Sequence, residues 1–212
     1  MKEKIKVLNL YAGIGGNRKL WENVDVTAVE INPEIAKVYK EFFPDDKVIV
    51  AEAHEYLLKH FKEYDFIWSS PPCPTHSIIR WKFVNSNTTK IDKTNLQPKY
   101  ADMSLYQEII LLMKHKHNCK WIIENVRSYY KPLIRPQKVG RHYFWSNFHI
   151  QKMKLPSEKI NQSRINEIAK LKGISTDFKI KNKLKIIRNA VNSKLGLHIF
   201  NCAFKERQEV LQ

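Results

Sequence analysis

The first 130 residues alternate between two hydrophobic periods. Short apolar runs rich in branched side chains are typical of buried strands, and they occupy residues 4–10, 26–30, 47–50, 64–70 and 120–126. Apolar residues three and four positions apart, the spacing of a helix with one buried side, occur in 32–43, 54–61 and 104–116. A further short helix is expected over 16–23. Strands that alternate with helices predict βαβ units, and therefore an α/β fold with a mostly parallel sheet and helices on both faces.

The rest of the chain is less regular. Residues 140–151 predict two short strands joined by a turn at Ser146 and Asn147. Residues 152–183 are polar and basic with room for one short helix, and 184–204 return to helical apolar spacing. The polar segment between Ser77 and Ser104 is long for a connection inside a compact domain. Loops of that length are usually lids or binding loops.

A glycine cluster follows the first strand. Gly13, Gly15 and Gly16 let the backbone pass close to a ligand at the carboxyl end of the sheet, which is the expected ligand crevice of an open α/β sheet. Glu30 ends the second strand, where a carboxylate can accept hydrogen bonds from both hydroxyls of a ribose. Together they indicate a nucleoside cofactor. They do not distinguish NAD from S-adenosylmethionine, although the incomplete glycine fingerprint favours a cofactor without a pyrophosphate.

The net charge of the chain indicates a polyanionic partner. Its 212 residues include 37 Lys and Arg against 21 Asp and Glu, a net charge of +16. Residues 151–212 hold 14 of those cations and only 5 of the acids. Such a field attracts polyanions, and nucleic acid is the leading candidate. No apolar run approaches the length of a membrane span.

The stretch "SSPPCPTHS" holds one thiol between prolines. Cys73 follows the fourth predicted strand, at the same edge as the glycine cluster, whereas Cys119 and Cys202 resemble buried structural cysteines. Three widely spaced cysteines argue against a disulfide scaffold and for a reducing compartment. Next to a methyl donor, a thiolate that adds to C6 of cytosine makes C5 nucleophilic enough to take the methyl group. An acid that holds a proton against N3 lowers that barrier, and Glu124 at the end of the fifth strand supplies one.

These stretches resemble the DNA cytosine C5-methyltransferase family. "LNLYAGIGGN", "VEIN", "SSPPCPTHS", "IIENV", "QKVGRHYFWSNF" and "IIRNAVNSKLG" are similar to the family's ordered motifs and cover about residues 5–150 and 184–203. The resemblance implies a Rossmann-like S-adenosylmethionine-dependent methyltransferase fold, with S-adenosylhomocysteine as the product. It predicts a catalytic domain of residues 1–148 and 184–212, with a very small basic target-recognition region at 149–183.

Residue roles follow from the matched motifs. The resemblance implies a nucleophilic Cys73, Glu124 at cytosine N3, Arg141 on the base and Asn125 as support for the catalytic pocket. It implies cofactor contacts from Tyr11, Gly13, Ile14, Gly16, Glu30, Ile31, Glu52, Pro72, Leu105, Asn189 and Ala190, and no metal. The chain departs from the motifs in two notable places: Val139 replaces a middle arginine, and Arg188 replaces a glycine.

We therefore expect a monomeric enzyme that methylates a flipped-out cytosine in double-stranded DNA, in the cytoplasm of a bacterium or a phage-infected cell. The short recognition region predicts a short or relaxed target sequence, with phosphate contacts from Lys152, Lys154, Lys170 and Lys172. The 78–104 loop is expected to close over the base, with Arg80, Lys82 or Lys90 on phosphates. Three alternatives stay open: a tRNA methyltransferase of the same family, an amino-methyltransferase and an inactive DNA-binding homologue.

Overall fold

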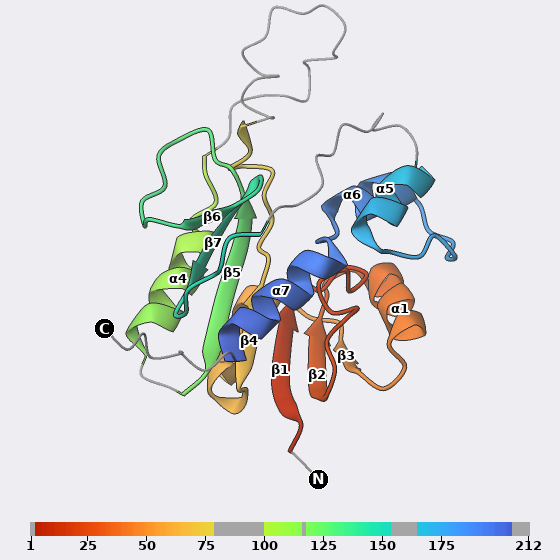
Figure 1. The fold of residues 1–212 in the computed structure, drawn as a ribbon, viewed down its shortest axis with the longest axis horizontal. Helices are drawn as coiled ribbons and strands as arrows, with labels where there is room; N and C mark the ends of the chain where they lie inside the picture. Colours follow the sequence, from red (N-terminus) through yellow and green to blue (C-terminus); the bar gives the residue numbers. More distant parts are fainter. Residues whose placement is uncertain (1–2, 79–99, 116–117, 154–164, 205–212) are drawn as a thin grey trace, which may run out of the picture.

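A computed structural model describes residues 3–78, 100–115, 118–153 and 165–204 of the chain (Figure 1). These residues form a seven-stranded sheet in the order β3-β2-β1-β4-β5-β7-β6. The strands are β1 Ile5–Leu10, β2 Val24–Val29, β3 Lys47–Ile49, β4 Phe66–Ser69, β5 Lys120–Val126, β6 Gln137–Val139 and β7 His142–Ser146. The first five strands pair in parallel, whereas β7 runs antiparallel to both β5 and β6. The predicted α/β class and mostly parallel sheet are confirmed.

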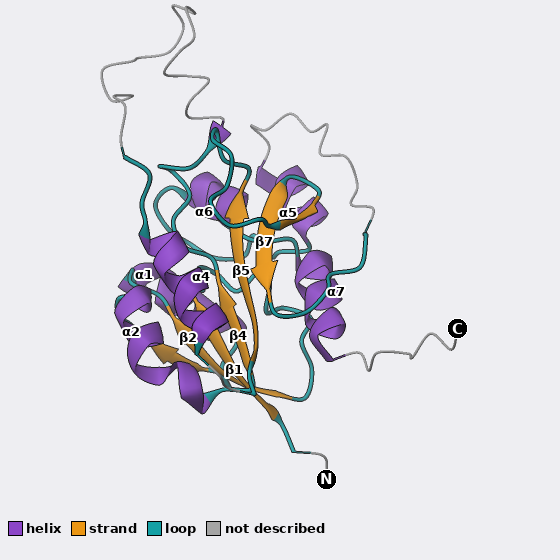
Figure 2. Ribbon diagram, turned by 90° about the vertical axis from the view of Figure 1, so that its left-hand side faces the viewer, coloured by secondary structure: helices purple, strands orange, loops and turns teal. Residues whose placement is uncertain are grey.

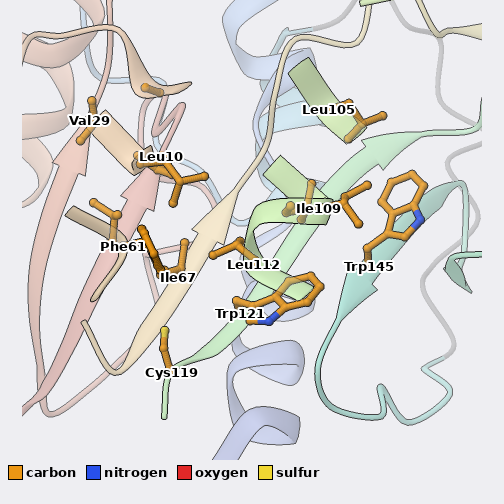
Figure 3. Close-up of a cluster of buried hydrophobic side chains, with 14 of the residues drawn as sticks. Leu10, Val29, Phe61, Ile67, Leu105, Ile109, Leu112, Cys119, Trp121 and Trp145 are labelled. Atoms are coloured by element: carbon orange, nitrogen blue, oxygen red, sulfur yellow. The ribbon is translucent and has the colours of Figure 1, made fainter. Parts of the chain in front are cut away.

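The helices cover both faces of the sheet (Figure 2). In the described residues they are α1 Pro33–Phe42, α2 Ala53–His60, α4 Ser104–Lys114, α5 Ile165–Lys172, α6 Lys183–Asn189 and α7 Ser193–Phe204, with a 3-10 turn at Phe61–Glu63. On one face, α2 and α4 bury an apolar cluster that includes Leu57, Ile109 and Trp121 (Figure 3). On the opposite face, α7 inserts Leu195 and Ile199 against the strands. Burial of this apolar surface is the main driving force for the layered arrangement.

The hairpin lies earlier in the chain than the sequence predicts. The turn falls at Gly140 and Arg141, between β6 and β7, and not at Ser146 and Asn147. Gly140 has a φ of 59°, a left-handed conformation that glycine adopts without steric cost. The expected second strand after Ser146 is absent from the described residues, and the Asn147 side chain accepts a hydrogen bond from the Trp121 amide.

The helix expected over residues 16–23 is also wrong. The segment consists of consecutive turns, with hydrogen bonds from Arg18 to Gly15 and from Trp21 to Arg18. Tertiary bonds compete with helix formation here: the Arg18 guanidinium is bonded to the buried Asp46 carboxylate at 2.9 and 3.0 Å. Helix nucleation has a free-energy cost that a segment of this length offsets with few helical hydrogen bonds, so the tertiary bonds of Arg18 prevail. The N-terminus of α1 is as predicted, with Asn32 as the cap and Pro33 in the first turn.

Beyond the carboxyl ends of the strands, α5 and α6 pack beside α1 (Figure 1). Val38, Ile168 and Ile187 belong to one buried cluster from these three helices. The single apolar pattern predicted over 184–204 is divided at Ala190 into α6 and α7. The predicted loop contacts Arg80, Lys82 and Lys90, and Lys154, lie outside the described residues. The division into a catalytic domain and a recognition region stays a prediction.

Two features are absent from the described residues. None of their helices combines the length and the apolar character that crossing a bilayer requires. The same residues contain no group of three or more His, Cys, Asp or Glu side chains arranged to hold a metal ion.

Candidate active site

Parallel pairing brings the predicted site residues to one edge of the sheet. β1 lies between β2 and β4, and β4 lies beside β5. The glycine turn follows β1, Glu30 follows β2, the Cys73 loop follows β4, and Glu124 is near the end of β5. Because parallel strands end at the same edge, groups far apart in the sequence are collected there.

Glu30 organises the glycine turn. One of its oxygens accepts from the Gly13 amide at 2.9 Å and the other from the Asn32 amide at 3.0 Å. The carboxylate is 8% exposed. A carboxylate has about four lone-pair sites, so each oxygen retains capacity for a further donor. Two ribose hydroxyls are donors of the required kind.

The glycine turn is also in close contact with the segment that follows α6. A Cβ on Gly16 would lie 2.4 Å from the Val191 carbonyl oxygen and 3.2 Å from the Ala190 Cβ. Only glycine allows the segment that follows α6 to approach this closely. By contrast, a Cβ on Gly13 would meet no atom within 4 Å, so the backbone there borders open space. The closing motif and the glycine turn are thus in contact, as a shared cofactor site requires.

A buried carboxylate that the sequence reasoning missed ties this edge together. Glu108 on α4 is fully buried and accepts from the Tyr11 hydroxyl at 2.7 Å and the Ser69 hydroxyl at 2.6 Å. His54 Nδ1 lies 3.2 Å from the same carboxylate, and this hydrogen bond raises the pKa of His54. Burial, followed by the Glu108 charge, raises the pKa of Tyr11, which keeps its hydroxyl protonated. The sequence signal for this site was Glu108 itself, a charged residue within the apolar stripe of the predicted helix.

The Cys73 loop is held by backbone and side-chain bonds. The Cys73 carbonyl accepts from the amides of His76 and Ser77, at 3.0 and 3.1 Å. The Asn125 side chain, 1% exposed, donates to the Pro71 carbonyl at 3.1 Å and accepts from the Val126 amide at 2.9 Å. Asn125 therefore fastens the proline-flanked loop to the strand that carries Glu124.

The surroundings of the Cys73 thiol do not activate it in the ligand-free state. The side chain is half-buried, and burial raises its pKa. The second cause of the raised pKa is the negative charge of Glu124, which places that carboxylate within electrostatic reach of the sulfur. A raised pKa favours the thiol over the thiolate.

Two further groups interact with Glu124, His142 by contact and Lys172 through its charge. His142 Nδ1 lies 2.5 Å from Glu124 Oε1. Lys172 on α5 donates to the carbonyls of Arg188 and Ala190, at 2.5 and 2.6 Å. Burial, followed by the positive charge of Arg141, lowers the pKa of Lys172 to about 8, and the charge of Glu124 opposes the shift. The sequence predicted a phosphate contact for Lys172, whereas its ammonium bonds the backbone around the end of α6.

The remaining predicted site residues differ in exposure. Ile31, Glu52, Pro72 and Asn189 are exposed, and Glu52 caps α2 by accepting from the Glu55 amide. Ile14 and Leu105, each 2% exposed, belong to buried apolar clusters. Ala190 is half-buried beside Gly16. Arg141 is exposed at the β6–β7 turn. Their individual contacts with cofactor or base stay predictions.

The sheet order, the glycine turn and the acid after β2 define the Rossmann-like class of S-adenosylmethionine-dependent methyltransferases. Residues 5–132 match the family described as C-5 cytosine-specific DNA methylase. The chain therefore belongs to this family, and its cofactor is S-adenosylmethionine.

Two similar proteins come from Spodoptera frugiperda. The first is a tRNA (cytosine(38)-C(5))-methyltransferase, 28% identical over 138 residues, which are 61% of this chain and 38% of that protein. The matched part thus spans well under half of the relative's length. The second is the crystal structure of a DNMT2 mutant, 13% identical, with a TM-score of 0.59 over 95% of this chain and 100% of the other. At that identity the structural likeness supports the fold alone.

Proposed function

We propose that this protein is a DNA cytosine-5 methyltransferase that works through a covalent bond between Cys73 and C6 of cytosine. The observation that carries the proposal is the joining of the Cys73 loop to the Glu124 strand. The Asn125 side chain donates a hydrogen bond to the Pro71 carbonyl, and the negative charge of Glu124 raises the pKa of the Cys73 thiol. A nucleophile and an acid are therefore presented together at the edge where the glycine turn and Glu30 lie.

The residues present fit S-adenosylmethionine. Glu30 retains acceptor capacity for ribose hydroxyls, the Gly13 backbone borders open space, and Ile31 beside Glu30 is 64% exposed and available to an adenine ring. When bound, the cofactor supplies an electrophilic methyl group. We assign the methionine end to Gly13, Ile14, Gly16 and Ala190, with Asn189 beside them. Tyr11, Glu52, Pro72 and Leu105 complete the proposed set.

The chain's own residues would activate the base. The Cys73 thiolate adds to C6, while Glu124 gives a proton to N3 and Arg141 orients the ring. Electron density then reaches C5, which takes the methyl group. Loss of the C5 proton and departure of the thiolate restore the aromatic ring, and N3 returns its proton to Glu124. Lys152 and Lys170 are exposed and are proposed to contact phosphates.

A second candidate substrate is tRNA. It is favoured by the curated relative, whose name assigns it to a tRNA cytosine. The thiol chemistry is the same for both polymers, so the polymer is a separate question from the mechanism.

The test is methyl transfer from labelled S-adenosylmethionine to duplex DNA and to tRNA in parallel, with the modified base mapped. DNA that contains 5-fluorocytosine should yield a covalent adduct with the wild type and none with Cys73→Ser, because fluorine at C5 blocks the final elimination. Labelling of tRNA alone would transfer the proposal to the second substrate. Methylation by Cys73→Ser at the wild-type rate would refute the mechanism.

A further inference from the structure

Glu124 has a titratable partner that the family motifs did not predict. β5 and β7 are antiparallel, with Val126 opposite His142 and Glu124 opposite Phe144. His142 is therefore the diagonal neighbour of Glu124 on one face of the sheet, within reach of a long side chain. Its Nδ1 lies 2.5 Å from Glu124 Oε1. The Glu124 side chain is 10% exposed and that of His142 is 29% exposed, so the imidazole connects a buried carboxyl with solvent.

An ionised Glu124 is unsuited to the proposed reaction for two reasons. A carboxylate has no proton to give to cytosine N3. Its negative charge also adds to burial in raising the pKa of the Cys73 thiol, which disfavours the attacking thiolate. The reaction therefore needs a proton stored at Glu124 or immediately beside it.

Other charges near Glu124 also favour its ionised form and therefore increase the requirement for a stored proton. Lys172 on α5 interacts electrostatically with Glu124 and with Arg141 at the β6–β7 turn, and the Cys73 thiol also interacts with the charge of Glu124. Nearby positive charge favours the carboxylate over the neutral acid. Lys172 already donates to the carbonyls of Arg188 and Ala190. Imidazole is the side chain that ordinarily gains and loses a proton between about pH 5 and 8.

Resting on the proposed function, we propose that His142 is a positioning residue that stores the proton through which Glu124 acts as an acid. The pair carries one proton, on Nδ1 or on the carboxyl. As the sulfur–C6 bond forms, this proton moves to N3 and leaves a neutral imidazole and a carboxylate. When the thiolate departs, N3 returns the proton to the pair. The C5 proton leaves to water, so His142 and Glu124 end the cycle as they began.

The first test is the pH dependence of single-turnover methyl transfer in the wild type and in His142→Gln. Glutamine can still donate a hydrogen bond to Glu124, but it stores no proton. Both proteins share the same increase in Cys73 thiolate with pH, so the informative quantity is the ratio of the wild-type rate to the His142→Gln rate. This ratio should be about tenfold near pH 6.5 and should fall as pH rises through the imidazole range. His60→Gln, which removes an imidazole from the exposed His60–Glu63 pair, is the matched control and should keep the wild-type profile.

A second measurement does not depend on activity. In NMR spectra of the ring, Glu124→Gln should move the resonance of His142 Nδ1, because its contact with the Glu124 carboxylate is lost. An unchanged resonance would overturn the pairing. A His142→Gln protein with the wild-type pH profile would overturn the inference alone. A wild type that methylates neither DNA nor tRNA would overturn the proposed function and this inference together.

Discussion

The Tyr11 hydroxyl donates to the fully buried Glu108 carboxylate over 2.7 Å, across 97 positions of the chain. This bond joins the residue at the end of β1 to the middle of α4, and Ser69 adds the end of β4. Three elements that border the proposed cofactor site are therefore held by one carboxylate. Loss of any donor leaves part of its charge without compensation.

Tyr11→Phe should destabilise the fold by about 1–3 kcal/mol, because buried Glu108 loses a donor. The Kd for S-adenosylmethionine should rise about tenfold, because the ring at the end of β1 is no longer held. Urea unfolding and calorimetric titration measure the two effects. Tyr56→Phe is the control, since the Tyr56 hydroxyl contacts the Tyr64 hydroxyl at 3.4 Å and no buried carboxylate depends on that contact. Equal cofactor affinity in both variants would contradict the role of Tyr11.

Asn125→Ala should lower kcat about a hundredfold, because the Cys73 loop loses its bond from Pro71 to β5. Asn147→Ala is a matched control near the other end of the strand. Asn147 bonds the Trp121 amide and the Cys119 carbonyl, at 3.0 and 2.9 Å. Both variants should lose about 1–3 kcal/mol of stability, but only Asn125→Ala should lose turnover. Comparable kcat values would show that the loop is held by other contacts.

The Cys73 thiol should react faster with iodoacetamide in Glu124→Gln than in the wild type. Removal of the negative charge removes one cause of the raised pKa, so more thiolate is present at pH 8. We expect an acceleration of about threefold to tenfold, measured on the Cys73 peptide by mass spectrometry. Cys119, 3% exposed, serves as the internal reference. Glu63→Gln should leave the rate unchanged, and a slower reaction in Glu124→Gln would reverse the electrostatic assignment.

Lys172→Met should weaken cofactor binding about tenfold, because the ammonium no longer holds the Arg188 and Ala190 carbonyls behind the glycine turn. The control is Lys170→Met, an exposed lysine of the same helix.

Lys172 should also leave a signature in the pH dependence of stability. Its pKa falls from 10.5 in the unfolded chain to about 8 in the folded protein, so the unfolded state binds more protons between those values. The free energy of unfolding should therefore rise with pH from about 8 to 10.5, by at most about 3 kcal/mol. Urea unfolding at pH 7.5 and 9.5 should show this rise in the wild type and in Lys170→Met. An equal rise in Lys172→Met would assign the effect to another group.

The sequence by itself determined the five parallel strands, their order along the chain and the residues at their carboxyl ends, but not the β6–β7 hairpin. Hydrophobic periodicity indicates which side of a segment is buried. Glycine and proline mark tight turns, and an acid at the end of a strand marks a candidate ligand contact. For that reason the glycine turn, Glu30, Cys73 and Glu124 could be predicted to share one edge. These are local properties, and they needed no knowledge of which strands are neighbours beyond the parallel rule.

Only the tertiary structure decided which side chains meet across that edge. The turn at Gly140 sets the β5–β7 register, and a shift of one residue would move His142 to the face opposite Glu124. The bonds from Lys172 to the Arg188 and Ala190 carbonyls depend on the packing of α5 against α1 and α6. The Tyr11–Glu108 bond depends on how α4 lies over the sheet. Such contacts between segments distant in the chain are set by register and packing, which no local pattern records.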